Sequence, residues 1–332
     1  MRILLASDAW YPQINGVVRT LSRVRDELQA QGHVFEVIYP DQFRTVPCPS
    51  YPEIRLAILP GTGLAGRIEA FGPDAIHIAT EGPIGLAVRN YCVRRGLPFT
   101  TSYHTRFPEY LSARVPLPLG WGYAFMRWFH RPSRGVMVAT QSMKRELVAH
   151  GFANLVDWTR GVDTAQFRPD VPKILDLPRP IHLYVGRVAV EKNIRAFLEL
   201  RLPGSKVVVG DGPQRAELEK AFADVTFAGA HHGEALAAHY ASADVFVFPS
   251  RTDTFGLVML EALASGLPVA AYPVPGPLDI VDGVGVGALS EDLGAAVASA
   301  IALPREACRA HALNYSWTAC AEMFLANLQP VR

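Results

Sequence analysis

Two acidic side chains, Asp253 and Glu261, stand eight positions apart in one stretch of the chain. The apolar run 245–248 before them predicts a buried parallel strand, and the residues leading to Gly266 predict a helix. Asp253 then lies in the turn and Glu261 on the helix, so at ~1.5 Å per residue their carboxylates are expected roughly 10 Å apart along the helix axis. A nucleoside diphosphate carrying a sugar has about this length, so one acid is expected at the sugar and the other at the ribose.

The turn between the two acids is expected to bind phosphate. Backbone N–H groups from Thr254 to Leu257 would point out of the helix start, where unsatisfied donors and the helix dipole favour an anion. Arg187 and Lys192 flank a second predicted strand-to-helix turn, and two cations there are suited to neutralising a leaving diphosphate. The chain has no Asp-x-Asp pair to hold a catalytic metal, so we expect these cations to act in its place, with neither metal nor cofactor.

The stretch around Asp253 resembles the motif of the retaining GT-B glycosyltransferases of family 4 (glycosyl transferases group 1), whose two acids stand eight positions apart before a Gly-Leu helix. Most members have Glu at the first position, and Asp keeps both acceptor oxygens on a shorter arm. The sequence Thr252-Asp253-Thr254-Phe255-Gly256-Leu257 is similar to the branch of sulfoquinovosyl diacylglycerol synthases and GDP-mannose-dependent α-mannosyltransferases. The residues that extend the resemblance along the chain are Gly16, His104, Arg187 and Lys192.

This resemblance implies roles for particular residues. His104 lies in the polar pair that ends the predicted strand 99–105, and it matches the His that the family places against the transferred sugar; by its sequence neighbours alone it would be a structural His. Gly210 opens a Gly-rich turn that is not the GxGxxG pattern, which argues against a nicotinamide enzyme. The implied catalytic residues are His104, Arg187, Lys192 and Asp253. The implied donor-binding residues are Gly16, Arg187, Lys192, Gly210, Ser250, Thr254, Phe255, Gly256, Leu257 and Glu261.

Predicted strands and helices alternate along the whole chain, as they do in α/β proteins with parallel sheets. The resemblance implies the GT-B fold, with two Rossmann-like doubly wound domains facing across a cleft. We expect an acceptor-binding domain over residues 1–165 and a nucleotide-sugar-binding domain over 166–312, joined by a Pro-rich hinge at about 164–178. Residues 313–332 are expected to form a helix that returns to the first domain.

A segment rich in aromatic and basic residues interrupts this pattern at 106–134. Trp interleaved with Arg on a short amphipathic helix suits a membrane interface, where rings lie at the headgroups and cations meet anionic lipid. The alternative is a buried helix below an acceptor pocket, with solvated arginines. Glu81 ends another predicted strand and is a candidate acceptor contact. The residues assigned to the acceptor or the membrane are Glu81, Tyr103, Arg106, Trp121, Arg127, Trp128 and Arg131.

Composition supports a globular protein without a membrane span. The chain has 332 residues, of which 49% are hydrophobic and 19% charged, and no apolar run approaches the ~18 residues that cross a bilayer. Its four cysteines show no paired spacing, so neither a zinc site nor a disulfide framework is indicated. We expect a cytoplasmic protein, peripheral on the inner face of the membrane, with no nucleic-acid partner.

The function expected from these features is transfer of a hexose from a UDP- or GDP-sugar to a lipid, either diacylglycerol or glycosyl-diacylglycerol, with retention of configuration. The alternative within the class is an α-mannosyltransferase or glucosyltransferase that acts on a soluble or polysaccharide-intermediate acceptor. A nucleotide-sugar epimerase or hydrolase, or an inactive sugar-nucleotide sensor, would belong to another class. Neither the base nor the sugar of the donor is set by the sequence.

Overall fold

The computed structural model describes residues 1–13, 15–48, 51–61, 63–104, 108–109, 118–253 and 255–331, with the side chains of 51–54 left aside. The chain forms two compact units, one made of Met1–Arg160 with Trp317–Arg332 and the other of Gly161–Ser316. The roles predicted for Arg106 and Thr254 concern residues that lie outside the described ranges.

The first unit contains a sheet of six parallel strands in the order β2-β1-β5-β6-β7-β8. Strands β2 and β5 lie on opposite sides of β1, so the winding of the chain reverses between β1 and β5. Ligands of open α/β sheets bind at such a reversal, beyond the carboxyl ends of the strands. The strands are β1 (Arg2–Ala6), β2 (Val34–Ile38), β5 (Ala75–Ile78), β6 (Thr100–Tyr103), β7 (Gly135–Val138) and β8 (Leu155–Asp157).

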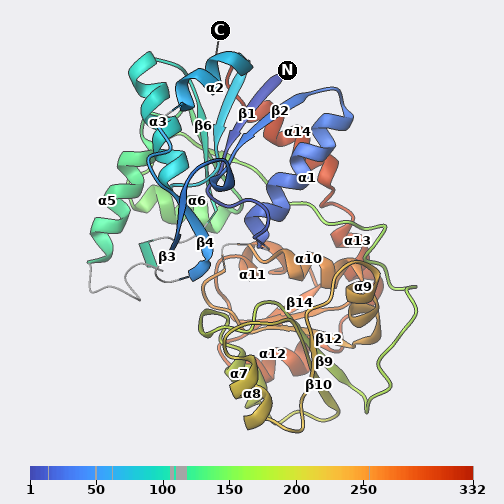
Figure 1. Ribbon diagram of the computed structural model, residues 1–332. Coiled ribbons are helices and arrows are strands. Elements are labelled where there is room, and N and C mark those ends of the chain that lie inside the picture. Colours follow the sequence, from blue (N-terminus) through green and yellow to red (C-terminus); the bar gives the residue numbers. More distant parts are fainter. Residues whose placement is uncertain are drawn as a thin grey trace. The chain divides into compact units, whose positions relative to one another are not determined.

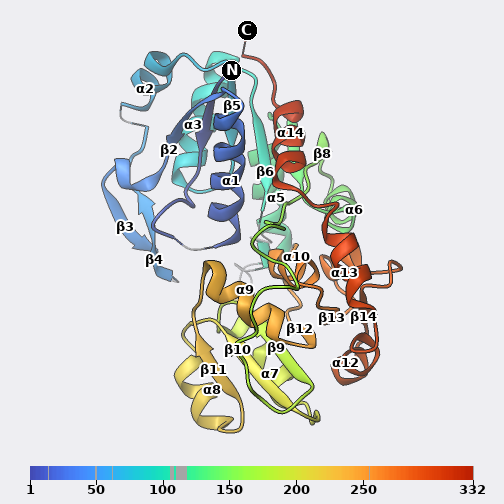
Figure 2. The same ribbon diagram turned by 90° about the vertical axis from the view of Figure 1, so that its right-hand side faces the viewer.

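Helices cover both faces of this sheet (Figures 1 and 2). Helix α1 (Gly16–Ala30) buries Val18, Leu21, Val24 and Leu28 at helical spacing and lies beside α14 (Trp317–Asn327), so the C-terminal helix belongs to the first unit. The opposite face carries α2 (Leu64–Phe71), α3 (Pro83–Arg95), α5 (Leu119–His130) and α6 (Gln141–Ala149). A short helix η1 (Pro40–Gln42) precedes the antiparallel pair β3 (Thr45–Cys48) and β4 (Tyr51–Ala57).

The second unit contains another six-stranded parallel sheet, in the order β11-β10-β9-β12-β13-β14. Here the winding reverses between β9 and β12. The strands are β9 (Ile181–Val185), β10 (Ser205–Val209), β11 (Thr226–Gly229), β12 (Val245–Phe248), β13 (Val269–Ala271) and β14 (Gly287–Leu289). The helices are η2 (Val190–Lys192), α7 (Ile194–Leu198), α8 (Arg215–Ala221), α9 (Gly233–Ser242), α10 (Leu257–Ala264), α11 (Pro277–Ile280), α12 (Leu293–Ala300) and α13 (Arg305–Ala312).

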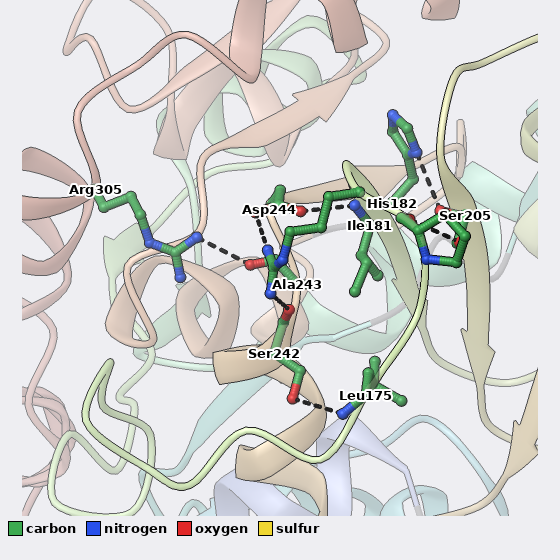
Figure 3. A network of polar contacts seen from close by, with 10 residues as sticks. Leu175, Ile181, His182, Ser205, Ser242, Ala243, Asp244 and Arg305 are labelled. Atoms are coloured by element: carbon green, nitrogen blue, oxygen red, sulfur yellow. Dashed lines mark hydrogen bonds and ion pairs between the residues drawn. The ribbon is translucent and has the colours of Figure 1, made fainter.

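A network of polar contacts ties the Pro-rich segment to the amino-terminal edge of the second sheet (Figure 3). The Ser242 hydroxyl accepts from the N–H groups of Ile174 and Leu175, at 2.8 and 3.3 Å. Asp244 pairs with Arg179 and accepts from the N–H of Ile181 at 2.7 Å. This edge lies opposite the carboxyl ends of β9 and β12, so the network fixes the start of β9 without occupying the loops at the reversal.

Across the described ranges, no helix has both the length and the apolar character needed to cross a membrane.

Candidate functional site

The loops at the reversal of the second sheet carry most of the residues predicted to bind the donor. Strand β9 runs into the turn Gly186–Asn193 that contains Arg187 and Lys192, and β12 runs into the segment 249–256 that contains Asp253. Neighbouring parallel strands end at the same edge of a sheet, so the fold brings these two loops together.

Three side-chain contacts hold the two loops side by side. Lys192 Nζ lies 2.5 Å from Asp253 Oδ1. Asn193 Nδ2 donates to the carbonyl of Pro249 at 3.1 Å, and the Thr252 hydroxyl donates to the carbonyl of Glu191 at 3.2 Å. The position of Lys192 relative to the carboxylate is therefore fixed by backbone as well as by charge.

The Asp253 carboxylate has one oxygen engaged and one available. Its side chain is 18% exposed and that of Lys192 is 24% exposed, so the pair lies largely out of water. Oδ2 is buried and has no hydrogen-bond partner among the described residues. A buried acceptor that lacks a donor is costly, and sugar hydroxyls are donors that would satisfy it.

The turn that carries Arg187 is built on close backbone packing. Gly210 has φ +145, and a Cβ on it would lie 1.9 Å from the carbonyl oxygen of Gly186. The Tyr184 hydroxyl donates to the carbonyl of Arg187 at 2.8 Å, while the Arg187 side chain is exposed. Gly210, predicted to bind the donor, therefore contributes by allowing the two turns to pack, which leaves the guanidinium at the surface.

Helix α10 begins within the second loop. Gly256 has φ +85, and a Cβ on it would meet Phe248 at 3.0 Å and Met259 at 2.8 Å, so both conformation and packing favour Gly. Leu257 is the first helical residue, and Phe255 is buried beside it. Ser250 is buried as well, and its hydroxyl accepts from the Thr252 N–H at 3.4 Å, so in this structure it shapes the loop.

Glu261 lies on α10, where the sequence predicted it. Its side chain is buried, and Oε2 accepts a hydrogen bond from the Tyr240 hydroxyl at 2.9 Å. Tyr240 comes from α9 and also contacts the carbonyl of Val258 at 3.3 Å. The carboxylate is thus oriented by a neighbouring helix.

The reversal of the first sheet has a buried carboxylate, Asp8, that the sequence analysis did not assign. It follows β1 and accepts from the N–H groups of Ile84 and Gly85, at 2.8 and 3.1 Å, and from the Thr80 hydroxyl at 2.9 Å. Burial raises the pKa of Asp8 to about 6, with Glu81 adding to the rise and the three donors opposing it. Its position directly after a strand at the switch point was the available sequence signal.

Glu81, predicted to contact the acceptor, is paired with a His from α5. Its Oε1 lies 3.2 Å from His130 Nε2, and His130 Nδ1 lies 2.9 Å from the Thr101 hydroxyl. Both side chains are largely buried. The pair connects the end of β5 with the end of α5.

His104 follows β6, and its ring is held by two residues far along the chain. Arg160 Nη2 lies 3.2 Å from His104 Nδ1, and the Trp158 ring meets the imidazole edge-on at 5.6 Å. Burial, followed by the charge of Arg160, lowers the pKa of His104 well below its usual range. Tyr103, the preceding residue, is buried in the core with Phe152.

Helix α5 carries apolar residues on both of its faces. Trp121 and Trp128 are 71% and 49% exposed, and Phe125 lies between them in the sequence and is also exposed. Their spacing of four and three residues forms one stripe on the outside of the helix. The inner face buries Tyr123, Met126, Phe129 and His130.

The arginines predicted for this segment differ in their surroundings. Arg131 and Arg134 are exposed in the short segment between α5 and β7. Arg127 is half-buried and donates to the carbonyl of His150 at 2.9 Å, so it packs against α6. Arg89 stacks on Trp128, with its guanidinium carbon 3.9 Å from the ring centre, and donates to the Trp128 carbonyl at 2.7 Å.

Gly16 is the exposed first residue of α1. Asn15 caps the helix, and its Oδ1 accepts from the N–H groups of Val17 and Val18, both at 3.0 Å. Among the residues that the structure describes, no group of three or more His, Cys, Asp or Glu is placed to hold a metal ion.

The fold has close structural relatives. Sucrose-phosphate synthase from Thermosynechococcus elongatus superposes with a TM-score of 0.73 at 20% identity, covering 98% of this chain and 97% of that one. The two doubly wound sheets are those of the GT-B fold.

Both parts of the chain match models of glycosyltransferase families. Residues 14–166 match "Glycosyltransferase Family 4" and residues 179–303 match "Glycosyl transferases group 1". A GDP-mannose-dependent alpha-mannosyltransferase from Mycobacterium tuberculosis is 30% identical over 367 residues, which covers 100% of this chain and 97% of that protein. The chain belongs to the family 4, group 1 glycosyltransferases, which confirms the resemblance drawn from its motifs.

Relatives within this family carry different names. The sulfoquinovosyl transferase SQD2 of Arabidopsis thaliana is 32% identical over 258 residues, covering 72% of this chain and 50% of that protein. An alpha-monoglucosyldiacylglycerol synthase from Streptococcus pneumoniae is 26% identical over 348 residues, covering 91% of this chain and 78% of that protein. They support a hexosyltransferase that uses a nucleotide sugar.

Proposed function

We propose that the protein transfers a hexose from a GDP- or UDP-sugar to diacylglycerol or glycosyl-diacylglycerol at an anionic membrane surface, with retention of configuration and without a metal ion. The exposed aromatic stripe of α5, which is followed by exposed positive charge, is the single observation that supports the lipid acceptor. The ion pair between the loops at the second switch point is the observation that supports a nucleotide-sugar donor.

On the donor side, the diphosphate would lie against Arg187, Lys192 and the start of α10. These groups stabilise the negative charge that develops on the leaving phosphate oxygen, which is the part a metal plays in other transferases. The Oδ2 of Asp253, which has no hydrogen-bond partner among the described residues, would accept from hydroxyls of the sugar, and Glu261 would bind the ribose.

Retention depends on the face of the sugar from which the acceptor attacks. Asp253 is paired with Lys192, and an ion-paired carboxylate is a poor nucleophile toward the anomeric carbon, so the proposed reaction has no covalent glycosyl-enzyme intermediate. Retention then requires the acceptor hydroxyl to attack from the face that the diphosphate leaves, because attack from the opposite face would invert the configuration. The bond from the anomeric carbon to the phosphate oxygen breaks, the new glycosidic bond forms, and the hydroxyl proton passes to the departing phosphate oxygen.

On the acceptor side, α5 has the chemistry of an interfacial helix. Exposed apolar stripes on soluble proteins mark interaction surfaces, and Trp is suited to the headgroup region of a bilayer. Arg131 and Arg134 place positive charge at the end of this stripe, where anionic headgroups would meet it. The relative named as a diacylglycerol glycosylating enzyme agrees with this assignment.

Product analysis tests the reaction. The purified protein is incubated with GDP-mannose, UDP-glucose or related donors and with diacylglycerol or glucosyl-diacylglycerol in mixed micelles, and the product is analysed by NMR. We expect an α-linked glycolipid from an α-linked donor, formed equally well in EDTA. A β-linked product would contradict retention, and loss of activity in EDTA would contradict metal independence.

Vesicle flotation tests the membrane surface. The wild-type chain is expected to float with vesicles that contain phosphatidylglycerol and to float poorly with phosphatidylcholine alone. The double variant Trp121→Ala/Trp128→Ala should lose at least tenfold in vesicle affinity, because it removes the two most exposed rings of the stripe. Val148→Ala, at an exposed apolar position of α6, serves as control and should bind as the wild type does.

Other outcomes would indicate the alternatives. A wild-type protein that stays in the soluble fraction, yet transfers sugar to a soluble oligosaccharide, would favour an α-mannosyltransferase or glucosyltransferase with a soluble acceptor. Release of free sugar, or of an altered nucleotide sugar, without any acceptor would favour a hydrolase or epimerase.

A further inference from the structure

Arg160 is a buried cation whose position is set by the backbone. Its side chain is 4% exposed. Nη1 donates to the carbonyls of Trp158 and Thr159, at 2.8 and 3.1 Å, and the guanidinium carbon lies 4.3 Å from the centre of the Trp158 ring. These contacts hold the guanidinium in place independently of His104.

The contact between Arg160 and His104 decides where the imidazole carries its proton. A guanidinium has N–H donors and no acceptor, so at 3.2 Å from Arg160 Nη2 the His104 Nδ1 must be the acceptor. A neutral imidazole that accepts at Nδ1 carries its hydrogen on Nε2. The edge-on Trp158 ring restricts rotation of the imidazole, and a ring flip would direct a different atom toward Arg160.

We propose that Arg160 is a positioning residue that holds His104 as the neutral tautomer protonated on Nε2, so that the imidazole can donate a hydrogen bond to a hydroxyl of the transferred sugar. The inference rests on the proposed glycosyl transfer. Transfer passes through a state in which positive charge builds on the sugar ring, as it does in glycoside hydrolysis. An imidazolium beside that ring would oppose the charge, whereas a neutral N–H donor would not.

The groups around His104 favour its neutral form. Burial is the largest influence on its pKa, followed by the positive charge of Arg160, and both lower it. His77 is itself buried, with Nδ1 and Nε2 each 2.8 Å from the hydroxyls of Thr100 and Ser102, and burial lowers its pKa to about 3. The Cys320 thiol lies near Arg160, and burial raises the pKa of that thiol to about 11, so it stays neutral.

Nitrogen NMR tests the tautomer directly. Protein labelled with ¹⁵N-histidine is compared with Arg160→Met and Arg160→Lys, and His104→Gln identifies the His104 ring signals. We expect wild-type His104 to show a protonated Nε2 and a bare Nδ1 from pH 6 to 8. Arg160→Met should yield a tautomer mixture or a protonated ring at the acid end, and Arg160→Lys should restore the wild-type pattern in part. A wild-type ring protonated on Nδ1, or a pattern unchanged in Arg160→Met, would overturn the proposal.

Kinetics separate positioning from folding. Arg160→Met should lower kcat about tenfold to a hundredfold, with less change in the donor KM, and its activity should fall off at a higher pH than the wild type on the acid side. Arg309→Met is the matched control, because Arg309 also donates to backbone carbonyls, those of Phe167, Ala264 and Thr164. That variant should lose stability but keep the wild-type pH profile and His104 signals.

The result is distinguishable from failure of the proposed function. If the wild-type protein transfers no sugar from any donor while His104 keeps its Nε2 proton only when Arg160 is present, the transfer reaction is wrong and the tautomer control stands. If transfer proceeds and Arg160→Met matches Arg309→Met in pH profile and in kcat, the positioning role is wrong.

Discussion

The two switch points of the molecule place their charges differently. In the second unit, Lys192 and Asp253 form a partly exposed pair between two loops, and Arg187 reaches the surface. In the first unit, Asp8 and the Arg160 side chain are buried and bound mainly by backbone groups. The second switch point therefore has charge within reach of solvent, while the first uses charge to fix the protein's own polar groups.

A buried network of hydrogen-bonded groups is suited to binding an uncharged ligand. Groups that are held by several hydrogen bonds keep their geometry, and an unpaired member would be costly, so such networks are specific in what they accept. Exposed and half-exposed cations bind phosphate with less demand on geometry. Removal of a charge should therefore lower turnover at either switch point. At the first switch point it should also change stability and the pH profile.

Lys192→Ala tests the donor side and should have the largest effect. Removing this cation takes away a charge contact that strengthens as the diphosphate leaves, so turnover at saturating donor should fall by about 10²–10³-fold. Steady-state kinetics with a nucleotide sugar in excess would measure this loss. Lys144→Ala removes a comparable ion pair, with Asp157 at 3.0 Å, and should stay within about twofold of the wild type. If Lys192→Ala kept the wild-type turnover, the charge at the second switch point would have no role in the reaction.

Asp8→Asn tests the acceptor side through pH. The folded-state pKa of Asp8 is raised from 3.8 to about 6, so the folded protein holds this proton more tightly than the unfolded chain does. Its contribution to stability is therefore greatest at acid pH and is lost as pH rises from about 4 to 6, by at most about 3 kcal/mol. Relative to the wild type, Asp8→Asn should become more stable by up to this amount between pH 4 and 7.

Urea unfolding at a series of pH values measures that difference. Asp26→Asn, at an exposed carboxylate paired with the adjacent Arg25, is the control and should follow the wild-type curve. A difference between Asp8→Asn and wild type that does not change with pH would show that the first switch point holds no strained charge.

Substitutions of Asn193 should have the smallest effect. They separate the contributions of a hydrogen bond and of a left-handed backbone conformation to the packing of the two loops. Asn193 has φ +52, and its side chain donates to the Pro249 carbonyl. Asn193→Ala loses the hydrogen bond and strains the left-handed backbone, for about 2 kcal/mol of stability, whereas Asn193→Gly loses the bond alone, for about 1 kcal/mol. Denaturant unfolding measures the free energy of unfolding of each variant and shows which loses more. Equal losses in the two variants would mean that the backbone conformation at this position is not a constraint.

The loops at the second switch point were easier to place from the sequence than the contacts at the first, for a physical reason. Arg187, Lys192 and Asp253 each follow an apolar strand and precede a helix, so their loops could be recognised from local pattern and spacing. The roles assigned to individual residues remain predictions. Among them, Gly210 and Ser250 are seen to shape the backbone, and Arg127 is seen to pack against α6.

The acceptor edge could not be derived in the same way. His104 contacts Arg160 across 56 positions, and Glu81 contacts His130 across 49, with no shared motif. Asp8 stood in the sequence as one acid in a Pro- and Gly-punctuated loop, and its backbone donors lie 76 and 77 positions away. Only the strand order β1-β5-β6 brings these groups to one edge.

By itself the sequence determined the fold class, the family and the types of charge at the second switch point, because a strand-turn-helix unit is recognisable from the period of its apolar residues and from its turn residues. The tertiary structure alone decided which side chains are buried and which atoms pair, including the Arg160 contact to His104 Nδ1. Burial and pairing depend on the free energy of desolvating groups that are distant in the chain, and this free energy cannot be predicted from a local sequence pattern.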